Sequence, residues 1–514
     1  MLSLVLCPPK GPNPLSILKK LAGQTLIYGT SIILSRLINL AFTPIYTNLF
    51  PREIYGIYTN LYAYVAFANV VVTFGMETTF FRFVQDQSDP KKVYGQAFAW
   101  VALMALSLGG LVGLLREPAA AWMGYAGQGS LILMLAGIIV LDALAALPLA
   151  RLRQEERVRW FAAILLTNVL VTLVANLVFV VWLRMGIEYV FVSNLIASVI
   201  RLGMSLWRNL PRHLRPDPKL LRPMLRYAFY IMLAGLAGIM NETLDRIMLP
   251  FRWTEGQWYD GALQSGESLN GIYGANYKLV MFIALATMAF RYAAEPFFFR
   301  EAGEKDSPRT FARVFHYFTL AALTGFLLVG SFAQELVSFD FFGLFGPDKT
   351  FIDRAYWSGL KAVPVLLLAY VFAGAYTNMS IWFKLTNQTR FAILFTGAGA
   401  LITILVNYFG IPHYGYMASA WATLLCYALM AGLVYVLGQR YYPIPYKLGR
   451  LGLYGLLFLL AYALNRQIGA VDGYWLAFGA KAGVVIASLG LVVLLEYLLP
   501  LRWADSPPST VHSE

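Results

Sequence analysis

The feature that most limits what this chain can fold into is a succession of fourteen long apolar segments, which cover most of its 514 residues. A helix needs about 20 mostly apolar residues to cross the hydrocarbon core of a bilayer. Only 13% of the residues are charged, whereas a soluble domain carries about 25%. The sequence therefore predicts an all-α integral membrane protein with about 14 transmembrane helices. The predicted spans are residues 21–49, 57–82, 93–115, 124–150, 160–183, 188–207, 226–250, 271–297, 313–338, 358–383, 391–410, 415–438, 448–466 and 474–499.

The segments between these spans alternate between rich and poor in Lys and Arg. When the N-terminus is placed in the cytoplasm, the basic residues concentrate on the cytoplasmic side, as the positive-inside rule requires. Residues 151–159 and 208–226 hold much of this charge. The net charge of +13 is therefore attributed to topology and to anionic lipid headgroups, and no nucleic-acid partner is expected. Both termini are predicted to be cytoplasmic.

Cysteine and histidine are too scarce for a disulfide framework or a metal cluster. The chain has two cysteines, Cys7 and Cys426, and four histidines, none with a second ligand four residues on. Sites of these kinds need several such residues at defined spacing. We therefore expect no metal site and no cofactor, apart from a coupling Na⁺ or H⁺ discussed below.

Two short patterns recur after a shift of six predicted helices. A Gly-Ile-Tyr motif with a further Tyr opens both the second and the eighth span, and an Arg–Asn pair seventeen residues apart recurs in the fifth and eleventh. Since six is even, the two halves have the same orientation and are related by an axis along the membrane normal. The matched positions are Gly56 and Gly271, Tyr62 and Tyr277, Arg159 and Arg390, and Asn176 and Asn407.

The repeat predicts a domain organisation of two six-helix lobes followed by two additional transmembrane helices. The segments are a cytoplasmic tail at 1–20, an N-terminal lobe at 21–207, a basic cytoplasmic linker at 208–225, a C-terminal lobe at 226–438, two further helices at 439–500 and a cytoplasmic tail at 501–514.

Charged residues inside the spans are the best candidates for a functional site. Inserting one into the membrane costs a free energy of about 2.5–3.5 kcal/mol on insertion scales, so such a residue normally faces water or a partner of opposite charge. Arg36 lies at the centre of the first span, with Asn39 near it at helical spacing and no acid three or four residues away. A guanidinium there can bind a phosphate with two hydrogen bonds. The alternative is a structural ion pair with an acid of another helix, such as Asp142 or Glu242.

The seventh and eighth spans supply further candidates. Glu242, Asp245 and Arg246 are candidates for a site that couples transport to Na⁺ or H⁺, because Glu242 and Asp245 share one helix face and Arg246 lies one turn from Glu242. The alternative is an intrahelical ion pair between Glu242 and Arg246 that only makes the segment insertable. Lys278 and Arg291 in the eighth span are candidates for binding an anionic headgroup.

Charged residues near the ends of the predicted spans are weaker candidates for a functional site. Lys361 and Lys481 lie close enough to the predicted outer ends to extend to the interface. Arg291 and Glu295 are four residues apart and are placed to neutralise each other. The repeat also suggests four gate residues at the inner ends of the second and eighth spans, Glu77, Arg82, Glu295 and Arg300.

Several local motifs stand out along the chain: residues 23–31 (GQTLIYGTS), Pro44-Ile-Tyr, Tyr55-Gly-Ile-Tyr, Asp245-Arg-Ile-Met-Leu, Gly271-Ile-Tyr and residues 414–423 (YGYMASAWAT). Together they resemble the polysaccharide flippases (Wzx type) of the multidrug/oligosaccharidyl-lipid/polysaccharide exporter superfamily. The resemblance implies two six-helix lobes in a V and alternating-access transport, with cations lining the cavity that hold a pyrophosphate. Arg36 fits that pattern.

The substrate implied by this resemblance is an oligosaccharide on undecaprenyl pyrophosphate, such as an O-antigen (lipopolysaccharide), capsule or exopolysaccharide repeat unit. It would be moved from the cytoplasmic to the outer leaflet of a bacterial inner membrane, coupled to a cation as in an antiporter. The expected partners are the bilayer, a polysaccharide polymerase and glycosyltransferases, and the protein is expected to be a monomer.

Three alternatives remain open at this point. Lipid II flippases of the same superfamily use arginines in helices one, two and eight, which this chain matches only in part. A cation-coupled multidrug exporter would have a cavity of acids and aromatic rings and usually twelve helices. A membrane glycosyltransferase or ligase would need a sizeable outer loop with catalytic residues, and the short loops here predict no enzyme.

Overall fold

The structure, a computed structural model, describes residues 33–34, 36–38, 40–86, 89–207, 209–302, 304, 306–339, 349–386, 388, 390–469 and 473–499. This part of the chain is helical except for loops and one antiparallel hairpin, β1 (Gln257–Tyr259) paired with β2 (Ala262–Gln264). Thirteen of its helical segments are long and apolar enough to cross a membrane. The first predicted span, 21–49, lies largely outside the described residues. The prediction of an all-α integral membrane protein is confirmed.

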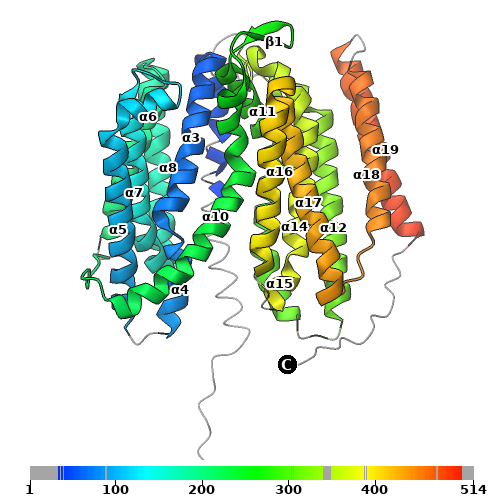
Figure 1. The fold of residues 1–514 in the computed structure, drawn as a ribbon. Helices are drawn as coiled ribbons and strands as arrows, with labels where there is room; N and C mark the ends of the chain where they lie inside the picture. Colours follow the sequence, from blue (N-terminus) through cyan, green and yellow to red (C-terminus); the bar gives the residue numbers. More distant parts are fainter. Residues whose placement is uncertain are drawn as a thin grey trace, which may run out of the picture.

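The helices form two lobes and an appended pair (Figure 1). The first lobe comprises α2 (Thr43–Leu49), α3 (Arg52–Thr73), α4 (Met76–Asp86), α5 (Pro90–Leu114), α6 (Arg116–Trp122), α7 (Gly129–Gln154), α8 (Val158–Asn176) with its π-helical extension η1 (Leu177–Trp182), and α9 (Glu188–Leu206). The second lobe comprises α10 (Pro218–Arg252), α11 (Gly266–Glu301), α12 (Ser307–Ser331), α13 (Ala333–Ser338), η2 (Arg354–Ala362), α14 (Val363–Met379), α15 (Ile381–Leu385), α16 (Arg390–Tyr414) and α17 (Tyr416–Tyr441). The pair is α18 (Leu448–Ile468) and α19 (Tyr474–Leu498), which packs against α12.

Some predicted spans are interrupted helices. The second span, predicted as one helix over 57–82, breaks between α3 and α4, where Phe74 and Gly75 have φ of 54° and 67°. Glycine adopts this left-handed conformation without steric cost, so it permits the break.

Helix α10 begins at Pro218, with the Asp217 carboxylate accepting a hydrogen bond from the Lys219 N–H at 3.0 Å, so the last part of the predicted linker is helical. An Asp cap followed by Pro is a strong helix start.

The repeat found in the sequence has structural counterparts in both lobes. Gly56 on α3 and Gly271 on α11 lie where the two helices cross, and a Cβ at either one would overlap a backbone carbonyl of the other helix. Asn176 and Asn407 are both fully buried, and each donates to the carbonyl oxygen four residues earlier, at 2.7 and 2.8 Å. The prediction of two lobes related by a parallel repeat is confirmed.

The lobes are joined most tightly at the end that carries the hairpin. There the Asn270 side chain donates to the Gly56 carbonyl at 3.0 Å, and the Tyr356 hydroxyl donates to the Phe50 carbonyl at 2.8 Å. The largest hydrophobic cluster also includes residues of both lobes at this end, such as Tyr55 and Leu269. The hairpin lies in a loop that the sequence places on the outer side of the membrane.

Helix α10, grouped above with the second lobe, also packs against the first. In Figure 1 it runs from the foot of the first lobe, near α4, up to the hairpin end. Its first part places Leu220, Met224 and Ala228 in a core with α4, α5 and α7. Its last part places Leu249 in the core shared with α11.

One expectation about charges near the outer ends is wrong. Lys481 does not extend to the interface: it is only 6% exposed, and its ammonium contacts the Glu335 carboxylate of α13 at 2.7 Å. Lys361 pairs with Asp260 of the hairpin turn. The ion pair of Lys481 fixes α19 to the second lobe, which the sequence of either helix alone does not reveal.

Candidate functional site

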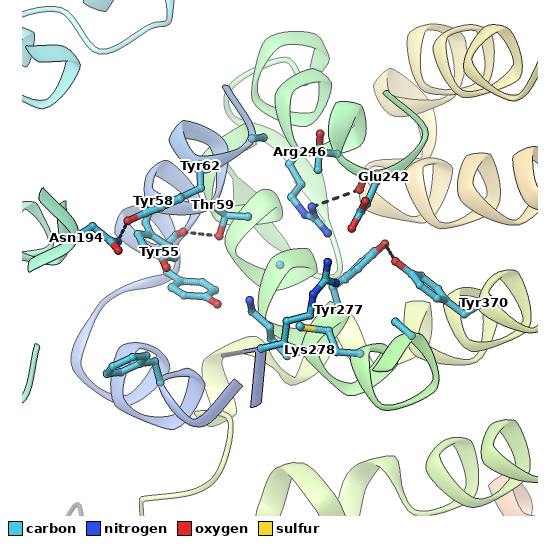
Figure 2. Close-up of a pocket in the computed structure, with 17 residues that line it drawn as sticks. Tyr55, Tyr58, Thr59, Tyr62, Asn194, Glu242, Arg246, Tyr277, Lys278 and Tyr370 are labelled. Atoms are coloured by element: carbon cyan, nitrogen blue, oxygen red, sulfur yellow. Dashed lines mark hydrogen bonds between the residues drawn. The ribbon is translucent and has the colours of Figure 1, made fainter. Parts of the chain in front are cut away.

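A cavity of about 420 Å³ lies between the lobes, and most of its walls come from α3, α10, α11 and α14 (Figure 2). Charged and aromatic polar side chains dominate its lining. Its charged residues are Arg36, Glu242, Arg246 and Lys278, and its tyrosines are Tyr55, Tyr58, Tyr62, Tyr277 and Tyr370.

Arg246 is held in place by its neighbours on α10 and α11. Its guanidinium lies 4.3 Å from the centre of the Tyr277 ring, a cation–π contact, and its NH1 group donates to the Glu242 carbonyl at 3.4 Å. No ion pair within 4.0 Å joins the Arg246 and Glu242 side chains, both of which are described. The intrahelical ion pair, one of the two alternatives that the sequence left open, is therefore not formed, and the Glu242 carboxylate remains exposed to the cavity.

Arg36 and Lys278 bring two more positive charges to the cavity wall. Within the described residues, no carboxylate forms an ion pair with either of them. Asp142, one partner suggested for Arg36, instead pairs with Arg201 and accepts a hydrogen bond from the Ser198 hydroxyl at 2.6 Å. Three cations thus face one carboxylate, and the cavity has a formal surplus of positive charge.

Tyrosines form the rest of the polar lining. On α3, the Tyr58 ring lies 5.7 Å from that of Tyr55 and 4.8 Å from that of Tyr62, between ring centres. The Asn194 amide of α9 donates to the Tyr62 hydroxyl. Figure 2 shows these α3 tyrosines on one side of the cavity and Arg246 with Glu242 on the other. The cavity therefore has an aromatic wall opposite a charged one.

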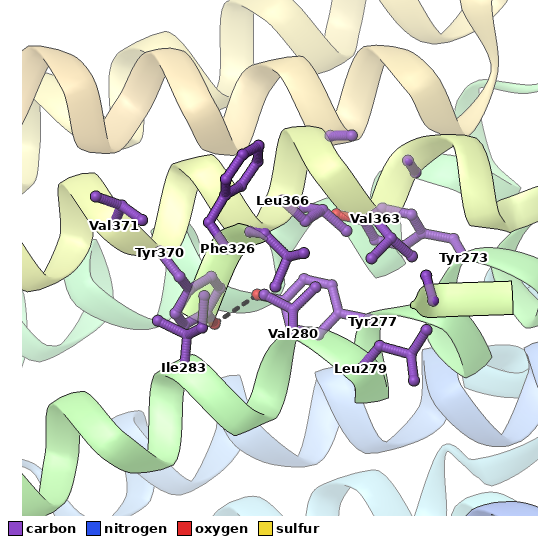
Figure 3. Packing of buried hydrophobic residues seen from close by; sticks show 14 of the residues in the cluster. Tyr273, Tyr277, Leu279, Val280, Ile283, Phe326, Val363, Leu366, Tyr370 and Val371 are labelled. Atoms are coloured by element: carbon purple, nitrogen blue, oxygen red, sulfur yellow. Dashed lines mark hydrogen bonds between the residues drawn. The ribbon is translucent and has the colours of Figure 1, made fainter. Parts of the chain in front are cut away.

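The second lobe adds two tyrosines on the side of Arg246, and they extend into its core. The hydroxyls of Tyr277 and Tyr370 are hydrogen-bonded at 2.7 Å (Figure 3). Figure 3 shows Val280, Ile283 and Phe326 packed around this pair. Because these neighbours are buried, the Tyr277 ring is fixed, and so is the guanidinium stacked on it.

Asp245 lies behind the cavity wall. Its carboxylate is buried and accepts hydrogen bonds from the Tyr273 hydroxyl at 2.6 Å and the Arg246 backbone N–H at 2.8 Å. It does not line the cavity, although it lies within one helical turn of Glu242. In the described part of the chain, no group of three or more His, Cys, Asp or Glu residues could hold a metal ion.

The remaining candidates lie elsewhere. Arg291 lines a separate small cavity with Lys384. Arg82 stacks over the Tyr227 ring of α10, 4.4 Å from its centre, while Glu77 pairs with Arg153 of α7. Asn39 lies outside the described residues, as do the side chains of Glu295 and Arg300.

The sequence interpretation missed the tyrosine wall. Aromatic residues are common at membrane interfaces, so their abundance alone gave no reason to place them in a cavity. The available signal was their position in the repeat, since Tyr58 and Tyr62 on α3 match Tyr273 and Tyr277 on α11.

Solved structures with the same fold are membrane transporters. An inward-facing MATE family transporter of the MOP superfamily aligns with a TM-score of 0.61 and 14% identity, covering 79% of this chain and 94% of the other. The lipid II flippase MurJ in an inward closed conformation aligns with a TM-score of 0.67 and 14% identity, covering 92% and 100%. A mutant of the Vibrio cholerae MATE transporter VcmN aligns with a TM-score of 0.56 and 13% identity, covering 83% of this chain and 97% of the other.

The chain is thus a multi-pass membrane protein whose fold is shared with these transporters. A family model described as "Polysaccharide biosynthesis protein" matches residues 21–300, more than half of the chain. The chain belongs to the polysaccharide biosynthesis protein family. A short match to a UTP23 sensor motif covers residues 8–22, outside the described residues. None of the curated protein sequences matches this chain significantly.

Proposed function

We propose that the protein is a flippase that moves an oligosaccharide linked to undecaprenyl pyrophosphate from the cytoplasmic to the outer leaflet. The observation that carries the proposal is the cavity between the lobes, in which Arg36, Arg246 and Lys278 outnumber the single carboxylate of Glu242. The task requires no bond to be made or broken, so the proposal includes no enzymatic activity.

The charge of the cavity suits a pyrophosphate. A pyrophosphate diester carries about two negative charges, and the surplus of cations over carboxylates in the cavity is also two. Such a headgroup must cross about 30 Å of hydrocarbon. Guanidinium groups bind phosphate oxygens through charge-assisted hydrogen bonds that are roughly twice as strong as neutral ones. A fixed set of cations therefore offsets the cost of removing the headgroup from water.

The aromatic wall suits the sugars next to the pyrophosphate. Tyrosine offers a flat apolar face for the C–H groups of a sugar ring and a hydroxyl for its polar groups. Tyr55, Tyr58 and Tyr62 present both within one stretch of α3, opposite Arg246. The proposed substrate thus has its phosphates at the charged wall and its first sugars at the aromatic wall.

The closed hairpin end supports transport by alternating access. The hydrogen bonds at Asn270 and Tyr356 hold the lobes together at the end predicted to face outward. The proposed cycle opens this end after substrate enters from the other. We place the protein in a bacterial inner membrane with both termini in the cytoplasm, where polysaccharide polymerases and glycosyltransferases act on the same lipid-linked sugars.

Glu242 favours cation coupling and also supports the second candidate function. Its carboxylate faces the cavity without a salt bridge from Arg246, so a coupling Na⁺ or H⁺ can reach it. The same acid, set among tyrosines, suits a multidrug exporter that binds organic cations. The surplus of positive charge favours the flippase, because it repels a cationic drug.

The test is translocation of a fluorescent polyprenyl-pyrophosphate oligosaccharide in proteoliposomes, with a small organic cation as the competing substrate. We expect transport of the lipid-linked sugar only, and a loss in Arg36→Gln that Arg52→Gln does not show. Arg52 is a matched control because it pairs with Glu53 outside the cavity. Efflux of the organic cation without movement of the lipid-linked sugar would replace the flippase by the exporter.

A further inference from the structure

A second basic cavity, of about 250 Å³, lies away from the first, at the end of the bundle opposite the hairpin. It is formed where the first turn of α5, the last turn of α7 and the segment before α10 meet. Its lining residues are Lys91, Tyr94, Arg151, Leu210 and Arg212.

The segment that closes this cavity is fixed against α5. The Tyr94 hydroxyl donates to the Asn209 carbonyl at 2.8 Å. The Gln96 amide donates to the carbonyls of His213 and Arg215 at 2.8 and 2.7 Å. A Cβ at Gly95 would overlap the Arg212 carbonyl, so only glycine permits this approach. These contacts fix the backbone of residues 209–215 against α5, so the shape of the cavity is defined by the fold.

The carboxylates near this cavity are engaged with other groups, so they do not balance the positive charges of Lys91 and Arg212. Glu155 pairs with Arg151 at 2.7 Å and with Arg157 at 2.9 Å, and Asp217 pairs with Lys92 at 2.6 Å.

Asp89 also lies close by, and its carboxylate caps α5 by accepting from the backbone N–H groups of the first turn. Within the described residues, neither Lys91 nor Arg212 forms an ion pair. The Arg151 guanidinium lies 4.8 Å from the centre of the Tyr94 ring, which orients it at the cavity wall.

Exposed apolar side chains lie in and next to the segment that forms one wall of the cavity, and one of them, Leu210, lines it. Trp207, Leu210 and Leu214 are 66%, 68% and 48% exposed, in and just before the basic segment. Exposed Trp and Leu next to Lys and Arg at a helix end are typical of contact with the headgroup region of a bilayer. A free phosphate in water would gain nothing from these residues, whereas a lipid acyl chain would.

We propose that this cavity binds the phosphate headgroup of an anionic phospholipid of the cytoplasmic leaflet, separately from the transported substrate. Lys91 and Arg212 provide the charge, Arg151 with Tyr94 forms the wall, and the lipid chains lie along Trp207 and Leu210. The site ties the inner end of the first lobe, and the segment that leads into α10, to anionic lipid.

The experiment measures binding of phosphatidylglycerol to the purified full chain by native mass spectrometry, with phosphatidylcholine as the zwitterionic comparison. Near a membrane surface each Lys or Arg contributes about 1 kcal/mol towards an anionic lipid. The double variant Lys91→Gln/Arg212→Gln should therefore bind phosphatidylglycerol roughly 10-fold to 30-fold more weakly. Phosphatidylcholine binding should not change.

Two further variants separate the site from general charge and from misfolding. Lys219→Gln/Arg222→Gln removes the same charge from exposed positions at the same end of the bundle, outside the cavity, and should bind like wild type. The charge-preserving Lys91→Arg/Arg212→Lys should also keep its affinity.

Four results would overturn the proposal. The first is unchanged phosphatidylglycerol binding in Lys91→Gln/Arg212→Gln. The second is an equal loss in the Lys219→Gln/Arg222→Gln control, which would assign the effect to overall charge. The third is a loss in the charge-preserving variant, which would assign the effect to shape. The fourth is displacement of phosphatidylglycerol by excess inorganic phosphate, which would identify a free phosphate as the ligand.

Discussion

Replacing Arg246 by Gln should weaken substrate binding while the fold is kept. The guanidinium stacks on Tyr277 at 4.3 Å and faces the cavity, so its charge is available to a phosphate. A hydrogen bond to a charged group contributes about 1.5–3 kcal/mol. Its loss corresponds to a fall in affinity of about 10-fold to 150-fold. The removal of one cation also halves the surplus charge of the cavity.

The matched control is Arg252→Gln, two turns further along α10. This guanidinium also stacks on a tyrosine, 4.1 Å from the centre of the Tyr408 ring, but it lies outside the cavity. Both variants lose one charge and one cation–π contact from the same helix. Any general effect on insertion or folding is therefore shared by the two.

The assay is the initial rate of flipping in proteoliposomes as a function of substrate concentration. The apparent KM should rise in Arg246→Gln and stay at the wild-type value in Arg252→Gln. Arg246→Lys should be intermediate, because an ammonium lacks the planar two-point contact with phosphate. Equal curves for all the variants and wild type would refute the reasoning that Arg246 holds the headgroup.

Two further predictions concern stability and the closed end. Lys481→Met should destabilise the protein by about 3 kcal/mol, because it leaves the largely buried Glu335 carboxylate, 15% exposed, without its ion-pair partner. Lys481→Met/Glu335→Leu should recover most of this loss. Thermal unfolding in detergent measures both, and an equal midpoint for the single and double variants would contradict the account. Gly56→Ala should open the hairpin end, because its methyl group would overlap the backbone of α11, whereas Gly110→Ala has open space and serves as the control. Labelling of a cysteine placed in the hairpin should increase only in Gly56→Ala; equal labelling in both would show that the close approach is not required.

The fold could be predicted from the sequence because its main determinants are local. The length of each apolar segment identifies a membrane span without knowledge of its neighbours. The repeat was readable at Gly56 and Gly271 because close helix crossing requires glycine at both equivalent positions. The break after Thr73 was missed because Phe74 and Gly75 sit within a continuous apolar run.

The site was only partly predictable because it depends on contacts between distant segments. Arg36, Lys278, Glu242 and Arg246 could be selected from the cost of charge in a membrane, and all four line the cavity. Whether Glu242 pairs with Arg246 depends on the Tyr277 ring, which draws the guanidinium away from the carboxylate and comes from another helix.

The same dependence on distant partners explains two other outcomes. Asp245 is hydrogen-bonded to Tyr273, and Lys481 forms an ion pair with Glu335. Each partner lies on a different helix, so residue spacing along a single helix could not identify it. Local sequence therefore indicates which charges require a partner, and tertiary packing decides which partner each one has.

The most direct test of the central claim is photo-crosslinking with a polyprenyl-pyrophosphate oligosaccharide that carries a photoreactive group beside the pyrophosphate. Peptides of the labelled protein are then identified by mass spectrometry. The account predicts labels in α3, α10 and α11, around Tyr58, Arg246 and Lys278, and their loss when unlabelled substrate is added in excess. Labels confined to the outer helices α18 and α19, or labels that excess substrate does not displace, would contradict the claim that the cavity between the lobes carries the lipid-linked sugar.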